Sequence, residues 1–390
     1  MANELFGARD TYTGVAGLRK LDIREDLLRY DADLAPLTVI SGRLDSKPTV
    51  NPEFKWYEKD RPTRRTTTTT TGTGTALTMA DQGLFAEHDI WRNTVTGENV
   101  RVVSTAGTSG SGVVTVVRGA TPVACSSGDE FIRVGTAQQE GDTSKPPRSY
   151  NPSAITNYTQ ITRTPYAATR TWQQSETLLR GSDWSEIADD AMREHLLDLE
   201  SSKLWGVPRE ITTGEHPRRE TGGAYHFIDT NVTDMGGAMT EAEFFDAFGD
   251  TFRYGSSSKF AFSGTLPIAV VNGYARGKLE VVQADDDDTY GVSISKYRQA
   301  GMTLNFVHHK LMDDSTTYEN DILILDFVQD GKSLIRQRYL TGAEYGSSNT
   351  HVREHIEEND RDGRKDEVLT EDGLEFGLEK SHALFWNITG

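Results

Sequence analysis

The run Asp285–Asp288 is the segment of this 390-residue chain whose residue types most clearly suggest a metal site. Carboxylate oxygens are the ligands that hard cations such as Ca²⁺ and Mg²⁺ prefer. Four consecutive aspartates cannot all face one ion, however, and the segment lacks the spaced ligands and the glycine of a calcium-binding loop. We therefore interpret the run as a solvated acidic loop and predict no metal site. Cation binding by several copies of this loop around a shared centre is kept as a hypothesis.

His308, His309 and Cys125 are the other residues whose types could do chemistry. Adjacent histidines in a strand point to opposite faces and cannot share one ion. A single cysteine excludes an internal disulfide and a thiolate metal cluster, and we interpret it as a small packing residue. The chain has no zinc-protease, phosphate-loop or nucleophile-elbow motif. We therefore predict no catalytic residue and no cofactor, and keep a carboxylate-dependent hydrolase that uses the aspartate run as an alternative.

Aromatic residues gather on two segments that we predict to be the arms of one long hairpin. Residues 51–56 form the first arm and residues 157–161 the second. Two strands that stand away from their own core are marginal in water, so the cover is expected to come from other copies of the chain. Aromatic side chains are enriched at the centres of interfaces, although ordinary cross-strand pairing is an alternative. The predicted inter-subunit contacts are Trp56, Tyr57, Tyr158, Tyr166 and Trp172.

The composition describes an acidic chain with much exposed surface. Charged residues make up 26%, apolar residues 36%, and the net charge is -18. This balance argues against a DNA-binding footprint, which would be a basic patch. No stretch approaches the roughly 20 apolar residues of a membrane-spanning helix, and the first ten residues do not resemble a signal peptide. Such acidity suits high salt, so a haloarchaeal source is a hypothesis that assembly indifferent to molar salt would contradict.

The first half of the chain divides into an arm, a hairpin and an inserted module. Residues 1–50 read as an N-terminal arm that is loop-like except for a short helix over residues 21–30. Residues 51–75 and 141–178 are predicted to form the extended hairpin, and the threonine-rich end of 51–75 is its stalk. Short strand-like runs punctuated by turn residues in 76–140 predict a small β-barrel-like module.

A long helix is predicted over residues 183–205. Asp183 and Glu186 have the spacing of a capping box, and apolar residues follow at steps of three and four. At 1.5 Å per residue the helix would be about 35 Å long. A helix of this length can carry a flat domain along one edge.

Residues 237–345 read as a second domain of mixed helices and strands. Thr240 and Glu243 form another capping-box pattern at the start of a helix. The run Ile322–Phe327 is apolar on both faces, which is typical of a central strand covered by helices. The fold class predicted for the whole chain is therefore α+β.

In this order the segments resemble the major capsid proteins of tailed double-stranded DNA viruses. These proteins have the Hong Kong 97-type fold, here in the subfamily with a β-module inserted in the extended loop. The motifs occur in the expected order across more than three hundred residues. They are Asn51–Trp56, Thr96–Val100, Val116–Gly119, Glu140–Gly141, Asn157–Ile161, Tyr297–Lys310, Ile322–Asp326, Leu369–Glu375 and Lys380–Ala383.

The resemblance implies a structural protein and not an enzyme. Hexamers and pentamers of the chain would tile an icosahedral shell, which encloses double-stranded DNA without sequence-specific binding and without a membrane. The protein would be assembled in the host cytoplasm and located in the virion. Residues 179–236 and 346–390 would form the peripheral domain, with the helix 183–205 as its spine, and 237–345 the axial domain near a symmetry axis. A tail or decoration protein of the virion is the alternative.

Further partners follow from the same resemblance. Portal and decoration proteins are expected to contact such a shell. The long N-terminal scaffolding segment of some relatives is absent from this sequence, which implies a separate scaffold protein or none.

We predict that neighbouring subunits are not joined covalently. Some relatives link a lysine to an asparagine of the next subunit. Lys55, Lys59 and Lys145 are the only lysines in or beside the predicted hairpin, and no pattern ties them to such a reaction. A denaturing gel of mature particles should therefore show the single chain of 43.2 kDa. A ladder of multimers would contradict this prediction.

Overall fold

The computed structural model of the protein describes most of the chain outside the N-terminal arm. The described residues are 35–44, 46–60, 63–106, 112–141, 148–175, 184–274, 279–281, 294–299, 301–340 and 350–389. They form two compact units, of which one is Tyr57–Ser153 and the other lies on both sides of it in sequence. Four features of the sequence analysis lie outside the described residues: the helix over 21–30, Lys145, Asp183 and the run 285–288.

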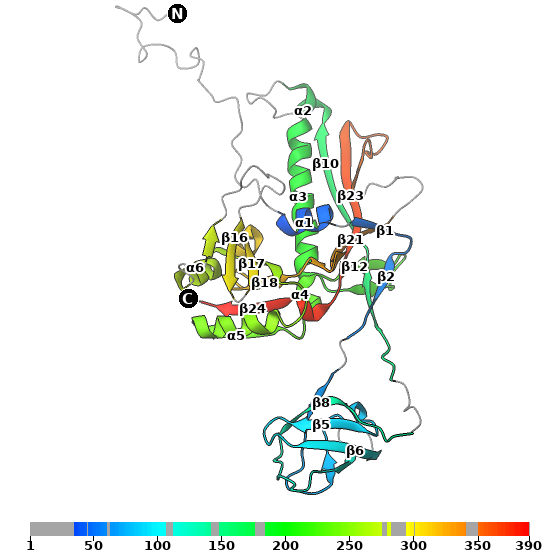
Figure 1. Cartoon of the computed structure of the whole chain (residues 1–390). Coiled ribbons are helices and arrows are strands. Elements are labelled where there is room, and N and C mark those ends of the chain that lie inside the picture. The colour runs from blue at the N-terminus through cyan, green and yellow to red at the C-terminus, as the bar shows by residue number, and fades with distance from the viewer. Residues whose placement is uncertain are drawn as a thin grey trace, which may run out of the picture. The chain divides into compact units, whose positions relative to one another are not determined.

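A five-stranded sheet forms one layer of the larger unit (Figure 1). Its strand order is β1-β21-β23-β10, and β22 also pairs with β23. β1 and β21 are parallel, whereas β23 is antiparallel to β10, β21 and β22. The bounds are β1 (Ser46–Thr49), β10 (Gln160–Thr169), β21 (Ile335–Leu340), β22 (Thr350–Arg353) and β23 (Gly363–Phe376).

The long helix α3 (Trp184–Trp205) packs along β10 on one face of this sheet, where the sequence predicted the spine helix (Figure 1). His195 connects α3 to the five-stranded sheet. Its Nδ1 lies 3.0 Å from the hydroxyl of Thr164 on β10, and its Nε2 lies 2.7 Å from the hydroxyl of Thr370 on β23. Burial lowers the pKa of His195, so the neutral ring is favoured and can accept one hydrogen bond and donate the other.

A seven-stranded sheet forms the second layer, in the order β13-β24-β18-β14-β17-β16-β15. The capping box at Thr240 and Glu243 is confirmed at the start of α5. All four residues of β18 are buried, as predicted for a central strand. The bounds are β13 (Val232–Gly237), β14 (Ser258–Ser263), β15 (Leu279–Val281), β16 (Ile294–Gln299), β17 (Met302–His308), β18 (Ile322–Leu325), β24 (Ala383–Ile388), α5 (Glu241–Thr251) and α6 (Thr265–Tyr274).

The predicted boundary between domains at residues 345 and 346 is wrong. β21 falls within the predicted axial domain but pairs with β23 in the five-stranded sheet. β24 falls within the predicted peripheral domain but lies between β13 and β18 in the seven-stranded sheet. The chain therefore crosses between the two sheets near its end. The choice of pairing partner depends on contacts far apart in sequence, and alternation within one strand does not encode it.

Short elements complete the larger unit. α1 (Pro36–Leu44) and β1 lie in the segment that the sequence analysis placed in a loop-like arm. The others are α2 (Arg170–Gln174), α4 (Ala224–Phe227), α7 (Lys310–Asp313), β11 (Arg209–Ile211), β12 (Arg218–Glu220), β19 (Val328–Gln329), β20 (Lys332–Ser333) and a 3-10 turn at Glu379–Ser381.

The predicted hairpin is present only at its base. β2 (Glu53–Glu58) pairs with β9 (Ser153–Tyr158), so the two arms meet as expected. The following residues, 160–169, form β10 of the five-stranded sheet and are not a continuation of the second arm. The amide of Thr159 still donates to the carbonyl of Pro52 at 2.8 Å.

The smaller unit contains a six-stranded antiparallel sheet in the order β3-β8-β5-β6-β7-β4. A bridge between Thr68 and Met79 joins its two end strands. Its core includes Trp91 and Phe131, which are fully buried. The bounds are β3 (Arg65–Thr67), β4 (Ala76–Thr78), β5 (Asp89–Asn93), β6 (Asn99–Ala106), β7 (Val113–Val117), β8 (Glu130–Thr136) and a 3-10 turn at Gln82–Leu84.

The threonine run belongs to this sheet and is not a stalk, so the module begins earlier than predicted. Thr66 and Thr68 are buried. The hydroxyl of Thr66 accepts from the amide of Asp81 at 3.3 Å, and that of Thr68 donates to the carbonyl of Thr78 at 3.0 Å. Threonine favours extended backbone, and here the hydroxyls also find partners inside the sheet.

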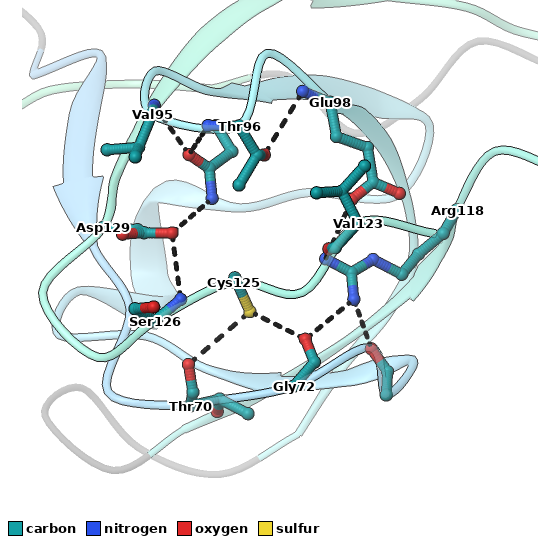
Figure 2. A network of polar contacts seen from close by, with 12 residues as sticks. Thr70, Gly72, Val95, Thr96, Glu98, Arg118, Val123, Cys125, Ser126 and Asp129 are labelled. Carbon is teal, nitrogen blue, oxygen red and sulfur yellow. Dashed lines mark hydrogen bonds and ion pairs between the residues drawn. The ribbon is translucent and has the colours of Figure 1, made fainter. Parts of the chain in front are cut away.

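Buried polar side chains hold the loops of the smaller unit in place (Figure 2). Arg118 forms an ion pair with Glu98 at 2.9 Å and donates to the carbonyls of Gly72 and Val123. Cys125 is fully buried, with its sulfur 3.3 Å from the carbonyl of Gly72. Its environment is that of a packing residue, as the sequence analysis interpreted it.

Candidate assembly surfaces and the buried centre behind them

Two of the five predicted contact residues are buried in their own chain. Trp56 is 9% exposed and packs beside Phe54 and Phe227, with ring centroids 6.2 and 5.7 Å away. Tyr166 is also 9% exposed and lies against Trp184 of α3. The prediction that these two side chains are free to contact another subunit is therefore wrong. The base of the hairpin and β10 lie on the core, and an aromatic strand pattern is the same whether the cover comes from the chain or from a neighbour.

Tyr57 and Trp172 are the predicted contacts that the fold leaves accessible, at 70% and 51% exposure, whereas Tyr158 is half-buried. Trp172 lies in α2, which continues from β10. The hydroxyl of Thr169 accepts from the amide of Trp172 at 3.3 Å, and Arg170 forms an ion pair with Asp362 at 2.7 Å. These contacts fix the backbone that carries the indole, and its contact with a second subunit stays a prediction.

Glu200 of α3 is fully buried and caps the N-terminus of α1, although the two are far apart in sequence. Its Oε1 accepts from the backbone amide of Leu37 at 2.8 Å, and its Oε2 accepts from the amide and the hydroxyl of Thr38 at 2.7 and 2.6 Å. A carboxylate placed here satisfies amides that lack partners within the helix and interacts favourably with the helix dipole. Pro36 also suits a first helical turn. These tertiary contacts explain why residues 36–44 form a helix that the sequence analysis missed.

His309 completes the environment of Glu200. Its Nε2 lies 2.7 Å from Oε1 of Glu200, and its Nδ1 has no hydrogen-bond partner among the described residues. Nε2 of His309 is therefore placed to donate a hydrogen bond to the carboxylate. Burial alone raises the pKa of Glu200, but hydrogen bonds from His309, Thr38 and Leu37 outweigh it and hold that pKa below its ordinary value of 4.5. The ionised carboxylate is thus the form that the site favours.

A second buried ion pair extends this polar centre. Nζ of Lys203, one turn after Glu200, lies 3.1 Å from Oδ2 of Asp372 on β23, and both side chains are nearly inaccessible. Asp372 also accepts from Nε2 of Gln337 on β21 at 2.6 Å. Nζ of Lys203 lies 3.5 Å from the hydroxyl of Thr38. We call Thr38, Glu200, Lys203, His309, Gln337 and Asp372 the polar centre, because together they join α1, α3 and the five-stranded sheet.

The sequence contained one signal for the polar centre. Lys203 occupies a position on the apolar stripe of the long helix, and a charged residue there must be buried with a partner. The partners of Lys203, however, are Thr38 and Asp372, which lie more than 100 residues away in the sequence. No local pattern pairs them.

The adjacent histidines lie apart, as expected for neighbours in a strand. His309 is fully buried beside Glu200, whereas His308 is partly exposed, with Nε2 2.5 Å from Oδ2 of Asp313. They contact different segments and form no common site.

One group among the described residues has the atoms for a metal ion. Ligand atoms of His355, Glu357 and Asp366 lie within 4.8 Å of one another. Both oxygens of Asp366, however, accept from the guanidinium of Arg364, at 3.1 and 2.6 Å. Glu357 accepts from the amide of Lys365 at 3.0 Å. A cation there would lie beside the charge of Arg364, so we assign no metal to this group.

Asp321 is expected to destabilise the protein at neutral pH. It is buried, Tyr225 donates a hydrogen bond to it at 3.1 Å, and burial raises its pKa from 3.8 to about 6. The folded state therefore binds a proton that the unfolded state has lost, and stability falls as the pH rises from about 4 through 6. Asp321→Asn should raise the unfolding free energy at pH 8 by up to about 3 kcal/mol.

Urea denaturation of the subunit at pH 8 and pH 4 measures this effect. The gain in stability should largely disappear at pH 4, where Asp321 of the folded parent is protonated and, like asparagine in the variant, carries no charge. Asp314→Asn, at an exposed position nearby, is the matched control and should change little. An Asp321→Asn variant that is no more stable than the parent at pH 8 would contradict the prediction.

Among the described residues, no helix has both the length and the apolar composition needed to cross a membrane.

Comparison with known proteins gives one family match and several similar structures. The SU10 major capsid protein family model matches residues 7–389. A major capsid protein of Pseudomonas phage PaMx41 is 25% identical over 238 residues, 57% of this chain and 56% of that protein. The match thus spans about half the length of this curated relative.

The similar structures are more distant in sequence. A chain of the capsid of a native GTA particle aligns with a TM-score of 0.51 and 9% identity, covering 96% of both chains. A chain from Microbacterium phage Oxtober96 aligns with a TM-score of 0.46 and 10% identity, covering 95% of this chain and 96% of that one.

Proposed function

Because the chain belongs to the SU10 major capsid protein family, we propose that it is the building unit of a viral capsid. Many copies would assemble into an icosahedral shell that encloses a double-stranded DNA genome. The observation that carries this proposal is the family match over residues 7–389. The α+β fold is of the Hong Kong 97 type, as expected from the sequence, and the aligned GTA capsid chain has the same fold.

The charge of the chain supports containment of DNA over recognition of it. A protein that binds DNA directly neutralises phosphates with lysine and arginine. This chain carries 41 such residues against 59 acidic ones, so counterions would have to lie between the shell and the genome. No catalytic role is part of the proposal.

The polar centre supports a specific role for the start of the described chain. In the proposed shell, the part of the predicted N-terminal arm (residues 1–50) that precedes α1 would reach a neighbour. α1 is the point where this arm would leave the subunit, and the hydrogen bonds from Leu37 and Thr38 to Glu200 fix that point on α3. Because α1 is held in place on α3, the arm loses less conformational entropy when it binds a neighbour.

The remaining roles are proposed from the family pattern. Within the larger unit, the part around the five-stranded sheet would be the peripheral domain, and the part around the seven-stranded sheet would be the axial domain. Trp172 and Tyr57 would contact adjacent subunits. A portal and, where present, scaffold and decoration proteins would be the other partners. The virion would be the location of the assembled protein.

Negative-stain electron microscopy of the expressed full chain, alone and with its scaffold if one exists, tests the proposal. Closed particles hundreds of ångströms across are expected. Tubes or small rings would favour a tail or decoration protein, and a small soluble oligomer would favour an enzyme. Either of these results would overturn the proposed function.

A further inference from the structure

The net charge of the protein is distributed unequally between its two units. Residues 57–153, the smaller unit, contain ten basic and ten acidic residues. The whole net charge of -18 therefore lies on the rest of the chain, where 31 basic residues stand against 49 acidic ones. Copies of the larger unit repel one another through this charge, whereas the smaller unit adds no net repulsion.

Arginines and branched apolar residues alternate on the outer face of the smaller unit. Strand register places Ile132 of β8 between Arg65 of β3 and Arg92 of β5. In the next row, Ile90 of β5 lies opposite Arg101 of β6. Val134 follows Ile132 on the same side of β8. We call these six residues the arginine–isoleucine face: Arg65, Ile90, Arg92, Arg101, Ile132 and Val134.

This face is exposed and little of its charge is compensated. Ile132 and Val134 are 41% and 55% exposed, and all three arginines are exposed. Arg65 lies 3.7 Å from Glu130, an exposed pair of little energetic value. Arg92 and Arg101 form no ion pair with any described residue. Other arginines of the unit, Arg118 and Arg133, do have buried carboxylate partners.

The composition of the face is that of a protein interface. Arginine is enriched in interfaces, and its side chain combines apolar area with a charge that remains useful on a partly dry surface. Isolated exposed apolar residues need no explanation, but here Ile132 and Val134 occupy alternate positions of one strand, and Ile132 lies between two arginines. Apolar area and positive charge together select a partner that offers apolar area and negative charge.

We propose that the arginine–isoleucine face docks on the acidic larger unit of a second copy of this chain. This inference deepens the proposed function and rests on it. The charge distribution is the argument for this occupant, because the larger unit carries the whole of the negative charge and is present at equal concentration in any assembly. A nucleic acid is disfavoured, since three arginines with apolar neighbours form too small a positive surface for a polyanion.

A photo-cross-linking experiment identifies the occupant. A photoreactive phenylalanine derivative replaces Arg101 in the full chain, and particles are assembled from a mixture of isotopically light and heavy copies. Mixed light–heavy cross-linked peptides from position 101 to residues outside 57–153 are expected. Links confined to the same copy, links to residues 57–153 of another copy, or no link in assembled particles would each overturn the inference.

Charge reversal tests the energetic contribution. Arg92→Glu/Arg101→Glu should raise the protein concentration needed for assembly about tenfold or more, since like charges in an interface are costly. Lys59→Glu/Arg64→Glu changes the net charge by the same amount at exposed positions outside the face. This control should raise the protein concentration needed for assembly much less. Equal thermal unfolding of both variants confirms that each has folded.

The two failures are distinguishable. If both double variants assemble at the concentration of the parent chain, the inference about the face is wrong while the proposed function stands. If the parent chain itself forms no particles with or without a scaffold, the proposed function fails and the inference fails with it.

Discussion

Lys203→Met should lower the unfolding free energy of the subunit by about 3–5 kcal/mol, the cost of leaving one partner of a buried ion pair behind. In the variant, the carboxylate of Asp372 stays buried and, among the described residues, keeps the side-chain hydrogen bond from Gln337 alone. The free energy is measured by urea denaturation of the unassembled subunit, followed by tryptophan fluorescence. Lys332→Met, at an exposed position, is the control and should cost little.

The double variant Lys203→Met/Asp372→Asn separates charge burial from packing. Asparagine can still accept the hydrogen bond from Gln337 and carries no charge. We expect it to recover most of the stability that the single variant loses, because neutral replacements of buried pairs are often well tolerated. A double variant as unstable as Lys203→Met would show that shape, and not charge, determines the loss.

Glu200→Gln should release α1 from α3. The amide cannot accept all four hydrogen bonds that the carboxylate receives from Leu37, Thr38 and His309, and its NH₂ group would face other donors. A loss of about 3 kcal/mol is expected. Hydrogen exchange of the amides in residues 36–44 should become at least about tenfold faster, which corresponds to about 1.4 kcal/mol of local opening.

The pH dependence of this effect has a defined sign. Because the pKa of Glu200 is below 4.5 in the folded protein, its contribution is present above pH 4.5 and is lost as the pH falls below it. The parent and the variant should therefore converge in stability in acid. Glu194→Gln, at an exposed position on the same helix, is the matched control. Unchanged exchange in residues 36–44 of Glu200→Gln would contradict the role of Glu200 as a cap.

The elements that could be predicted from the sequence are those with local signals. α3 and α5 combine helical periodicity with capping patterns, and the Thr240–Glu243 box forms as predicted. β18 is recognisable because it is apolar on both faces and is fully buried. The order of such elements along the chain is also enough to indicate the fold family.

The features that could not be predicted depend on contacts distant in sequence. α1 forms because Glu200, 163 residues away, accepts from its first turn. β24 and β21 each pair in the sheet opposite to the one expected, although their own patterns are ordinary strand patterns. Trp56 was expected at an interface and is instead in the core, because the sequence does not state which surface covers an aromatic side chain.

The bridge between Thr68 and Met79 pairs the two end strands of the smaller unit with each other. Backbone hydrogen bonds from the amide of Thr69 to the carbonyl of Thr78 and from the amide of Ala80 to the carbonyl of Thr67 extend this bridge on both sides. Along this seam, therefore, neither end strand of the smaller unit presents a free row of amides and carbonyls. An unpaired row would template strand exchange between copies held at high local concentration. With that route closed along this seam, strand exchange cannot start there, and contacts between copies at this place must be made by side chains.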